Sequence, residues 1–174
     1  MILPRTRRAL IVGPLFAVLL AGLLFGVGRA SDFLQIVDTY WRVHDEVLLP
    51  AEEGRRYIDL YWTYGGELVN LIQHNQAAFD MGRDIIEAFE PPLRALVDGR
   101  GQEVGITNDM VIQVEAYLDL LMKIGSPDLQ AAIREERART PLRDLVGMTF
   151  EEARLKLLGP PQLEFPSPTS TSLP

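Results

Sequence analysis

The sequence predicts an all-α fold: a small irregular helical bundle of about five to seven helices, preceded by an N-terminal signal or anchor helix. Apolar residues recur at intervals of three and four through most of the chain after Ser31. Prolines, glycines and capping residues divide this region into segments of helical length, and no segment alternates like a strand. We therefore expect an N-terminal segment (1–30), a helical domain (31–159) and a disordered Pro/Ser/Thr-rich tail (160–174).

The first thirty residues have the pattern of an export signal. Arginines at positions 5, 7 and 8 precede an uncharged apolar run, residues 9–28, so we expect a cytoplasmic N-terminus and an external domain after Ala30. Small residues at 28 and 30 fit cleavage before Ser31, which would release a secreted protein. At about 1.5 Å per residue the run can also span a membrane core of about 30 Å, so a retained single-pass anchor is the alternative.

The composition of the chain excludes some classes of partner and some chemistry. The 174 residues include 17 basic and 24 acidic side chains, a formal net charge of −7. Residues 1–30 hold four arginines and no acid, so the remainder has 13 basic and 24 acidic side chains, a formal net charge of −11. Such a surface repels phosphates, and we expect no nucleic-acid partner. The sequence contains no cysteine, which excludes disulfides and thiolate chemistry.

Helical segments are expected along the first half of the domain. The first begins at Ser31–Asp32 and ends at Pro50, with an apolar stripe made of Phe33, Ile36, Val37, Tyr40, His44, Val47 and Leu48. The second begins near Ala51, and Gly65–Gly66 is expected to bend or break it. The third covers 76–90, and Pro91–Pro92 is expected to start a short fourth helix that stops in the loop at 98–101.

The second half has clearer boundaries. Thr107 or Asn108 is expected to cap a helix that closes at Gly125. Ser126–Pro127 then supplies an N-cap and an N1 proline for a helix whose charged run, 134–137, is expected to face outward. A short helical turn follows Thr140–Pro141, and a capping box at 149–152 opens the last helix, which ends at Gly159–Pro160.

Part of the first hairpin resembles a known family. Residues 43–49 (Val-His-Asp-Glu-Val-Leu-Leu), 54–58 (Gly-Arg-Arg-Tyr-Ile) and 61–64 (Tyr-Trp-Thr-Tyr) are similar to the helical part of bacterial CFI-box C-terminal domains. The resemblance covers about residues 36–72 and implies a helical hairpin in an exported envelope protein. The family's cysteine box is absent and Gly65–Gly66 replaces its Ser-Pro, so no attachment role that depends on the cysteine carries over.

The sequence shows no catalytic, cofactor-binding or metal-binding motif. His44 and His74 lack metal-ligand spacing, and His44 is expected at the edge of the core with one hydrogen bond. We therefore expect a non-enzymatic protein. The alternative is a small-ligand binder or hydrolase whose site lies between the first helices and uses His44, Asp45 and the tyrosines.

Aromatic residues concentrate in the first hairpin, and they are the one feature that points to a binding role. They are Tyr40, Trp41, Tyr57, Tyr61, Trp62 and Tyr64. One interpretation is a tyrosine-lined core with polar tips that reach water. The other is a contact patch, with Trp41, Trp62 and Tyr64 as candidate residues, for an envelope protein, a glycan or the membrane interface. The function expected is an interaction module on the outer face of the cytoplasmic membrane.

Overall fold

The computed structural model describes residues 30–160, with side chains described from residue 34. The expected signal or anchor segment before residue 30 and the expected disordered tail after residue 160 lie outside this part. The described chain forms six α-helices, one π-helical turn and one 3₁₀ turn. In chain order they are α2 (Ala30–Arg42), η1 (π, Val43–Leu48), α3 (Glu52–His74), α4 (Gln76–Val97), α5 (Asn108–Ile124), α6 (Pro127–Arg139), η2 (3₁₀, Leu142–Leu145) and α7 (Phe150–Leu158).

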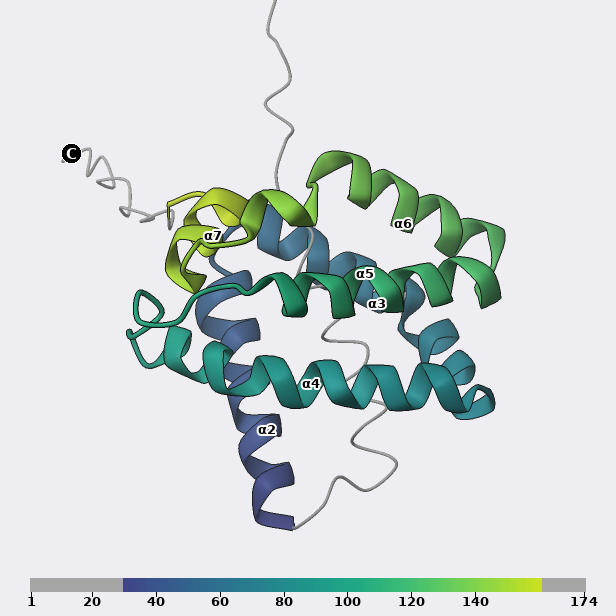
Figure 1. Ribbon diagram of the computed structural model, residues 1–174, viewed down its shortest axis with the longest axis horizontal. Helices are drawn as coiled ribbons and strands as arrows, with labels where there is room; N and C mark the ends of the chain where they lie inside the picture. The colour runs from purple at the N-terminus through teal and green to yellow at the C-terminus, as the bar shows by residue number, and fades with distance from the viewer. Residues whose placement is uncertain (1–29, 161–174) are drawn as a thin grey trace, which may run out of the picture.

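The expected all-α bundle is confirmed. Strand-type pairing within residues 30–160 is limited to one isolated antiparallel bridge, between Gly105 and Thr149. Helices α4, α5 and α6 run back and forth beside one another, and α2 crosses α4 at a steep angle (Figure 1). Helix α7 packs on α3 and α4. No helix of this part is both long and apolar enough to span a membrane.

The first helix differs from expectation in which residues it buries. Ile36, Tyr40 and Val43 lie in the core, and Val43 was not on the expected stripe, whereas His44 is half-buried at the edge of the core, as expected. The α-helix is then followed by the π-helical turn η1, where the Leu49 amide donates to the His44 carbonyl five residues earlier. A π turn adds one residue to the helical repeat, so the next buried position after Val43 is Leu48. A constant helical period could not have predicted this shift.

Helix α3 continues through Gly65–Gly66, so the expected interruption there is wrong. Each glycine costs a helix about 1 kcal/mol relative to alanine. Burial of Tyr61 before the pair, and of Leu68 and Ile72 after it, holds both halves of the helix against the same core. Packing on both sides therefore outweighs the local preference of the glycines.

Helix α4 also continues where a boundary was expected. Pro91 and Pro92 lie inside it, and no separate fourth helix starts there. Each proline removes one backbone donor from the helix. Pro92 is buried, and Phe89 and Leu93, on either side of it in the helix, belong to the core cluster. Apolar packing thus keeps the helix continuous although two of its hydrogen bonds cannot form.

The caps expected in the second half are confirmed. Thr107 accepts from the Met110 amide, Ser126 from the Leu129 amide, and Thr149 forms a complete capping box with Glu152. The turn after Pro141 is the 3₁₀ segment η2. The structure adds that the Ser126 amide and hydroxyl both donate to Glu67, at 2.6 and 2.9 Å. This contact ties the start of α6 to the middle of α3.

Candidate functional site

His44 and Asp45 lie together on η1. His44 Nδ1 is 2.7 Å from Asp45 Oδ1, and the His44 side chain is 18% exposed. The Trp41 ring meets the imidazole edge-to-face, with centroids 5.6 Å apart. The histidine is thus at the edge of the core with a hydrogen bond, as expected. No group of three or more His, Asp or Glu side chains in the described residues is placed to hold a metal ion.

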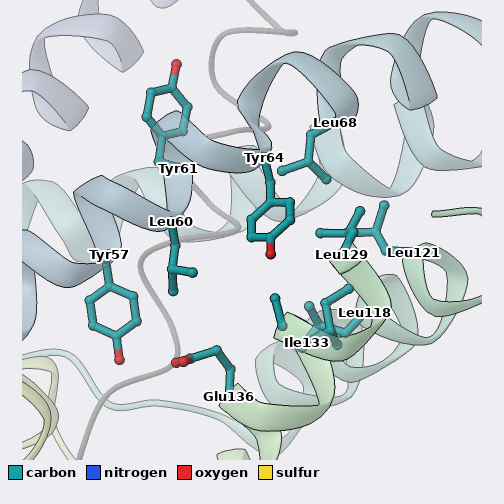
Figure 2. A pocket seen from close by; sticks show the side chains of 11 residues that line it. Tyr57, Leu60, Tyr61, Tyr64, Leu68, Leu118, Leu121, Leu129, Ile133 and Glu136 are labelled. Carbon is teal, nitrogen blue, oxygen red and sulfur yellow. The ribbon is translucent and has the colours of Figure 1, made fainter. Parts of the chain in front are cut away.

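Three tyrosines of α3 share an apolar pocket. Tyr57, Tyr61 and Tyr64 line a hollow between α3, α5 and α6 (Figure 2). The other lining residues are Leu60, Leu68, Leu118, Leu121, Leu129, Ala132, Ile133 and Glu136. His44 and Asp45 are not among them, so the structure does not bring these two residues to the tyrosine pocket.

The three rings take different positions in this pocket. In Figure 2 the Tyr57 and Tyr64 hydroxyls point toward α6, and the Tyr61 ring points away from it. Tyr57 is buried, with 2% of its surface exposed. Tyr64 is half-buried, and its hydroxyl reaches the Asp128 carbonyl at 3.5 Å. Tyr40 lies apart from the pocket, buried on α2.

Glu136 supplies the charged side chain of the pocket lining. Sequence reasoning placed it on the outer face of α6, and this is wrong: the residue is 8% exposed. Arg56 Nη1 and Nη2 each donate to one carboxylate oxygen of Glu136, both at 2.6 Å. Arg56 also bonds Glu53, which accepts from Arg139 of α6. A carboxylate can be buried because a guanidinium matches both of its oxygens.

The Tyr57 hydroxyl lies next to this ion pair. It is buried, and it interacts with the Arg56 guanidinium, which lies 5.1 Å from the centre of the Tyr57 ring. Burial raises the pKa of Tyr57 above its ordinary value; the Glu136 charge adds to this, and the charge and hydrogen bonding of Arg56 oppose it. The phenol therefore stays protonated at neutral pH.

The two tryptophans lie at the surface. Trp62 of α3 is 70% exposed, and Trp41 of α2 is 52% exposed. Each has an exposed aspartate one turn before it on its own helix, Asp59 before Trp62 and Asp38 before Trp41. Asp45, four residues after Trp41, lies on η1 and pairs with His44. Of the candidate contact residues, Trp41 and Trp62 thus face solvent, whereas Tyr64 lines the pocket.

Sequence reasoning missed the Arg56–Glu136 pair and the pocket beside it. The two residues are 80 positions apart, in unremarkable charged segments, and nothing local distinguishes them from solvated residues. Comparison of the chain with known protein families, curated proteins and solved structures finds no match. Nothing in these comparisons bears on the resemblance to CFI-box domains, which stays a prediction.

Proposed function

We propose that this protein is an exported, non-enzymatic interaction module that binds another component of the bacterial envelope through its exposed tryptophans. The exposure of Trp62 carries the proposal. A side chain of this size that is 70% exposed gains little from folding, whereas tryptophans are among the residues that contribute most to protein interfaces. Trp41, 52% exposed, offers a second contact of the same chemistry.

The surroundings of the tryptophans favour a basic partner. Asp59 lies one helical turn before Trp62, and Asp38 lies one helical turn before Trp41. An arginine or lysine of a partner can contact an indole face and a neighbouring carboxylate at once, which combines a cation–π contact with an ion pair. The formal net charge of −11 after residue 30 acts in the same direction, since it attracts basic surfaces over a longer range.

The location of the module follows from the export pattern at residues 1–30. If the apolar run 9–28 is retained, the domain is held at the outer face of the cytoplasmic membrane; if it is removed, the domain is released. Native mass spectrometry of the protein from its own host distinguishes these forms. A chain that begins at Ser31 is a released module, and a full-length chain in the membrane fraction is an anchored one.

Site-specific photo-crosslinking tests the binding surface. A photoreactive amino acid at position 62 or 41 is expected to capture a basic envelope component in the native host. At position 112, where the apolar Ile112 is 48% exposed on α5, capture of that component is not expected. Binding of the identified partner to the W41A/W62A variant should weaken at least tenfold, because hot-spot tryptophans contribute about 2 kcal/mol or more each. Equal loss with I112A would argue against the proposal.

A further inference from the structure

We propose that the exposed face of α2 and η1 is a docking surface for a helix of the partner protein, one in which apolar and basic side chains alternate at one-turn spacing. The proposal rests on the interaction function proposed above and specifies the segment that the partner presents. Three features carry it: a line of exposed apolar residues, the acidic residues between them, and a helix backbone whose hydrogen bonds are already made.

Helix α2 is attached to the bundle along one side. Ile36 and Tyr40 lie in the core, and Thr39 donates a hydrogen bond to Glu90 of α4 at 3.0 Å. In Figure 1 the N-terminal end of α2 extends beyond α4. The opposite side of α2 is therefore open to a partner.

Exposed apolar side chains form a line on that open side. Leu34 is 67% exposed, Trp41 52% and Leu49 46%, and they are three of the seven large apolar side chains that are exposed in the described part of the chain. Residues seven apart lie on the same face of an α-helix, which places Leu34 and Trp41 together. The π turn adds one residue to the repeat, so the position two turns beyond Trp41 is Leu49, eight residues on. The line extends over about 20 Å.

Acidic residues occupy the turns between these apolar positions. Asp38, one turn before Trp41, is exposed. Asp45, one turn after Trp41, contacts His44 through one carboxylate oxygen, and 63% of its side chain is exposed. The line thus alternates between apolar and acidic side chains, and a complementary segment alternates between apolar and basic ones.

Nearby arginines leave the acidic character of the line in place. Arg42, at the end of α2, donates to Glu46 and to Asp98 rather than to Asp38. Arg55 of α3 donates to the Leu49 carbonyl at 3.0 Å, so positive charge lies at that end of the line. The basic groups of the partner are therefore expected opposite the two aspartates and not beyond Leu49.

The partner segment is expected to be helical. An extended peptide binds largely through main-chain hydrogen bonds, as at the edge of a sheet. Along α2 these groups are bonded to one another within the helix, so an extended chain would leave its own amides and carbonyls unpaired at the contact. A helix has its backbone bonds already made and presents side chains at one-turn spacing, which is the spacing of the line on α2 and η1.

A second copy of this chain and a lipid surface fit the line less well. A second copy would bring the same acids, and a formal net charge of −11 after residue 30, to the contact. In a lipid surface Asp38 would leave water between two apolar side chains without a cation to pair with. A basic helix supplies that cation, and its arginine or lysine can also contact the Trp41 ring.

Two synthetic peptides of about 18 residues test the docking surface. In the ordered peptide, leucine and arginine alternate every three to four residues along one helical face, with alanine elsewhere. The scrambled peptide has the same composition, with leucines and arginines spread around the helix. Each is titrated into the full chain, carried in nanodiscs of zwitterionic lipid, and empty nanodiscs are the blank.

Trp41 reports on binding at the line itself. The chain has two tryptophans, so the W62F variant leaves Trp41 as the single one. The ordered peptide should move Trp41 emission to shorter wavelength in a saturable way, because the indole leaves water. The scrambled peptide should bind at least about tenfold more weakly. Isothermal titration of the wild type gives the same comparison without the W62F substitution.

Matched variants locate the contact. L34A and L49A should each weaken the ordered peptide about three- to tenfold, since each removes apolar surface from the line. L155A is their control, an equally exposed leucine on α7 that should change binding less than about twofold. D38N should weaken binding about threefold and reduce its dependence on salt. D59N, one turn before Trp62, is the control for D38N and should leave binding unchanged.

Several results would overturn the proposal. Equal affinity for the ordered and scrambled peptides would mean that charge alone attracts them. Equal losses with L155A or D59N would place the contact elsewhere on the surface. Binding no greater than that of empty nanodiscs would mean that the peptide prefers lipid to the protein.

The peptide titration needs no native partner, so its outcome is separate from that of the proposed function. Capture of a basic component at position 62 in the native host, together with failure of the titration, would keep the interaction module and remove the docking surface on α2. A successful titration without capture at position 41 or 62 would instead remove the proposed native function and, with it, the native partner of this surface.

Discussion

Arg56 and Glu136 form a two-point ion pair that joins α3 to α6 across 80 residues of sequence, with both nitrogen–oxygen distances at 2.6 Å. The two side chains differ in exposure, at 27% for Arg56 and 11% for Glu136. Removal of either partner leaves the other charge unpaired, and the free-energy cost is larger when the remaining charge is the more buried one. This asymmetry makes the pair testable.

R56A is expected to lower the free energy of unfolding by about 2 kcal/mol, and E136A by about half as much, because the pair is only partly buried. The double variant should lose less than the sum of the two. Urea unfolding followed by circular dichroism measures all three. R83A is the control: Arg83 pairs with exposed acids, so a change within about 0.5 kcal/mol is expected. Equal losses for R56A and R83A would contradict a structural role of the pair.

Buried tyrosines predict a loss of stability in alkali. Burial raises the pKa of Tyr40, Tyr57 and Tyr117, so each stays neutral in the folded chain at a pH where it ionises in the unfolded chain. Their contribution is fully present below the ordinary tyrosine pKa of about 10 and is lost above it, by about 1.4 kcal/mol per pH unit for each tyrosine. Urea unfolding between pH 8 and 11, with absorbance at 295 nm, measures this dependence.

Y117F should reduce the loss of unfolding free energy with rising pH by the contribution of one buried tyrosine. The Tyr117 hydroxyl has no hydrogen-bond partner, so phenylalanine can take its place with little cost at pH 8. Ionisation of all five tyrosines near pH 10 in a chain that is still folded would contradict the burial described here.

The two prolines of α4 should respond in opposite directions. P91A restores a backbone donor at an exposed position, and we expect a gain of about 1 kcal/mol after the added freedom of the unfolded chain is subtracted. P92A removes a buried ring, so its gain in backbone bonding is offset by lost packing. Thermal unfolding compares the two. A loss of stability in P91A would show that the helix requires the proline there.

Glycines of α3 provide a second contrast. An added methyl group at Gly66 meets nothing within 4 Å, so G66A should stabilise the protein by about 0.5–1 kcal/mol. At Gly54 the methyl carbon would lie 2.1 Å from the Leu48 carbonyl oxygen, a backbone atom of η1. G54A should therefore destabilise, by about 1–3 kcal/mol. Chemical denaturation measures the free energy of unfolding of both variants. Similar values for G66A and G54A would mean that η1 and α3 are not in close contact at Gly54.

Helix boundaries set by local chemistry could be predicted. Ser126 and Thr149 were identified as caps, and Thr107 as one of two candidates with Asn108, because a capping side-chain oxygen bonds an amide only a few residues away. Apolar residues recur every three or four positions, and no segment alternates like a strand. This pattern was sufficient to predict the all-α fold class. These signals act within one or two helical turns, so they do not depend on how the helices pack.

The failures lie where packing opposes a local rule. Gly65–Gly66 and Pro91–Pro92 are helix breakers by themselves, yet the core holds α3 and α4 continuous through them. The π turn at Val43–Leu48 makes Leu48, five residues on, the next buried position after Val43, and this turn contacts both α3 and α4. The spacing of apolar residues along the sequence does not predict where such a turn occurs.

By itself, the sequence determined the helical class, most caps of the second half and the acidic charge, since each depends on residue type and short spacing. Only the tertiary structure decided which charges are buried and which tyrosines share a pocket. Glu136 looks like any surface acid of a charged helix until α6 lies against α3 and brings Arg56 within reach. Contacts between distant residues depend on the mutual placement of helices, and that placement results from the packing of the whole core.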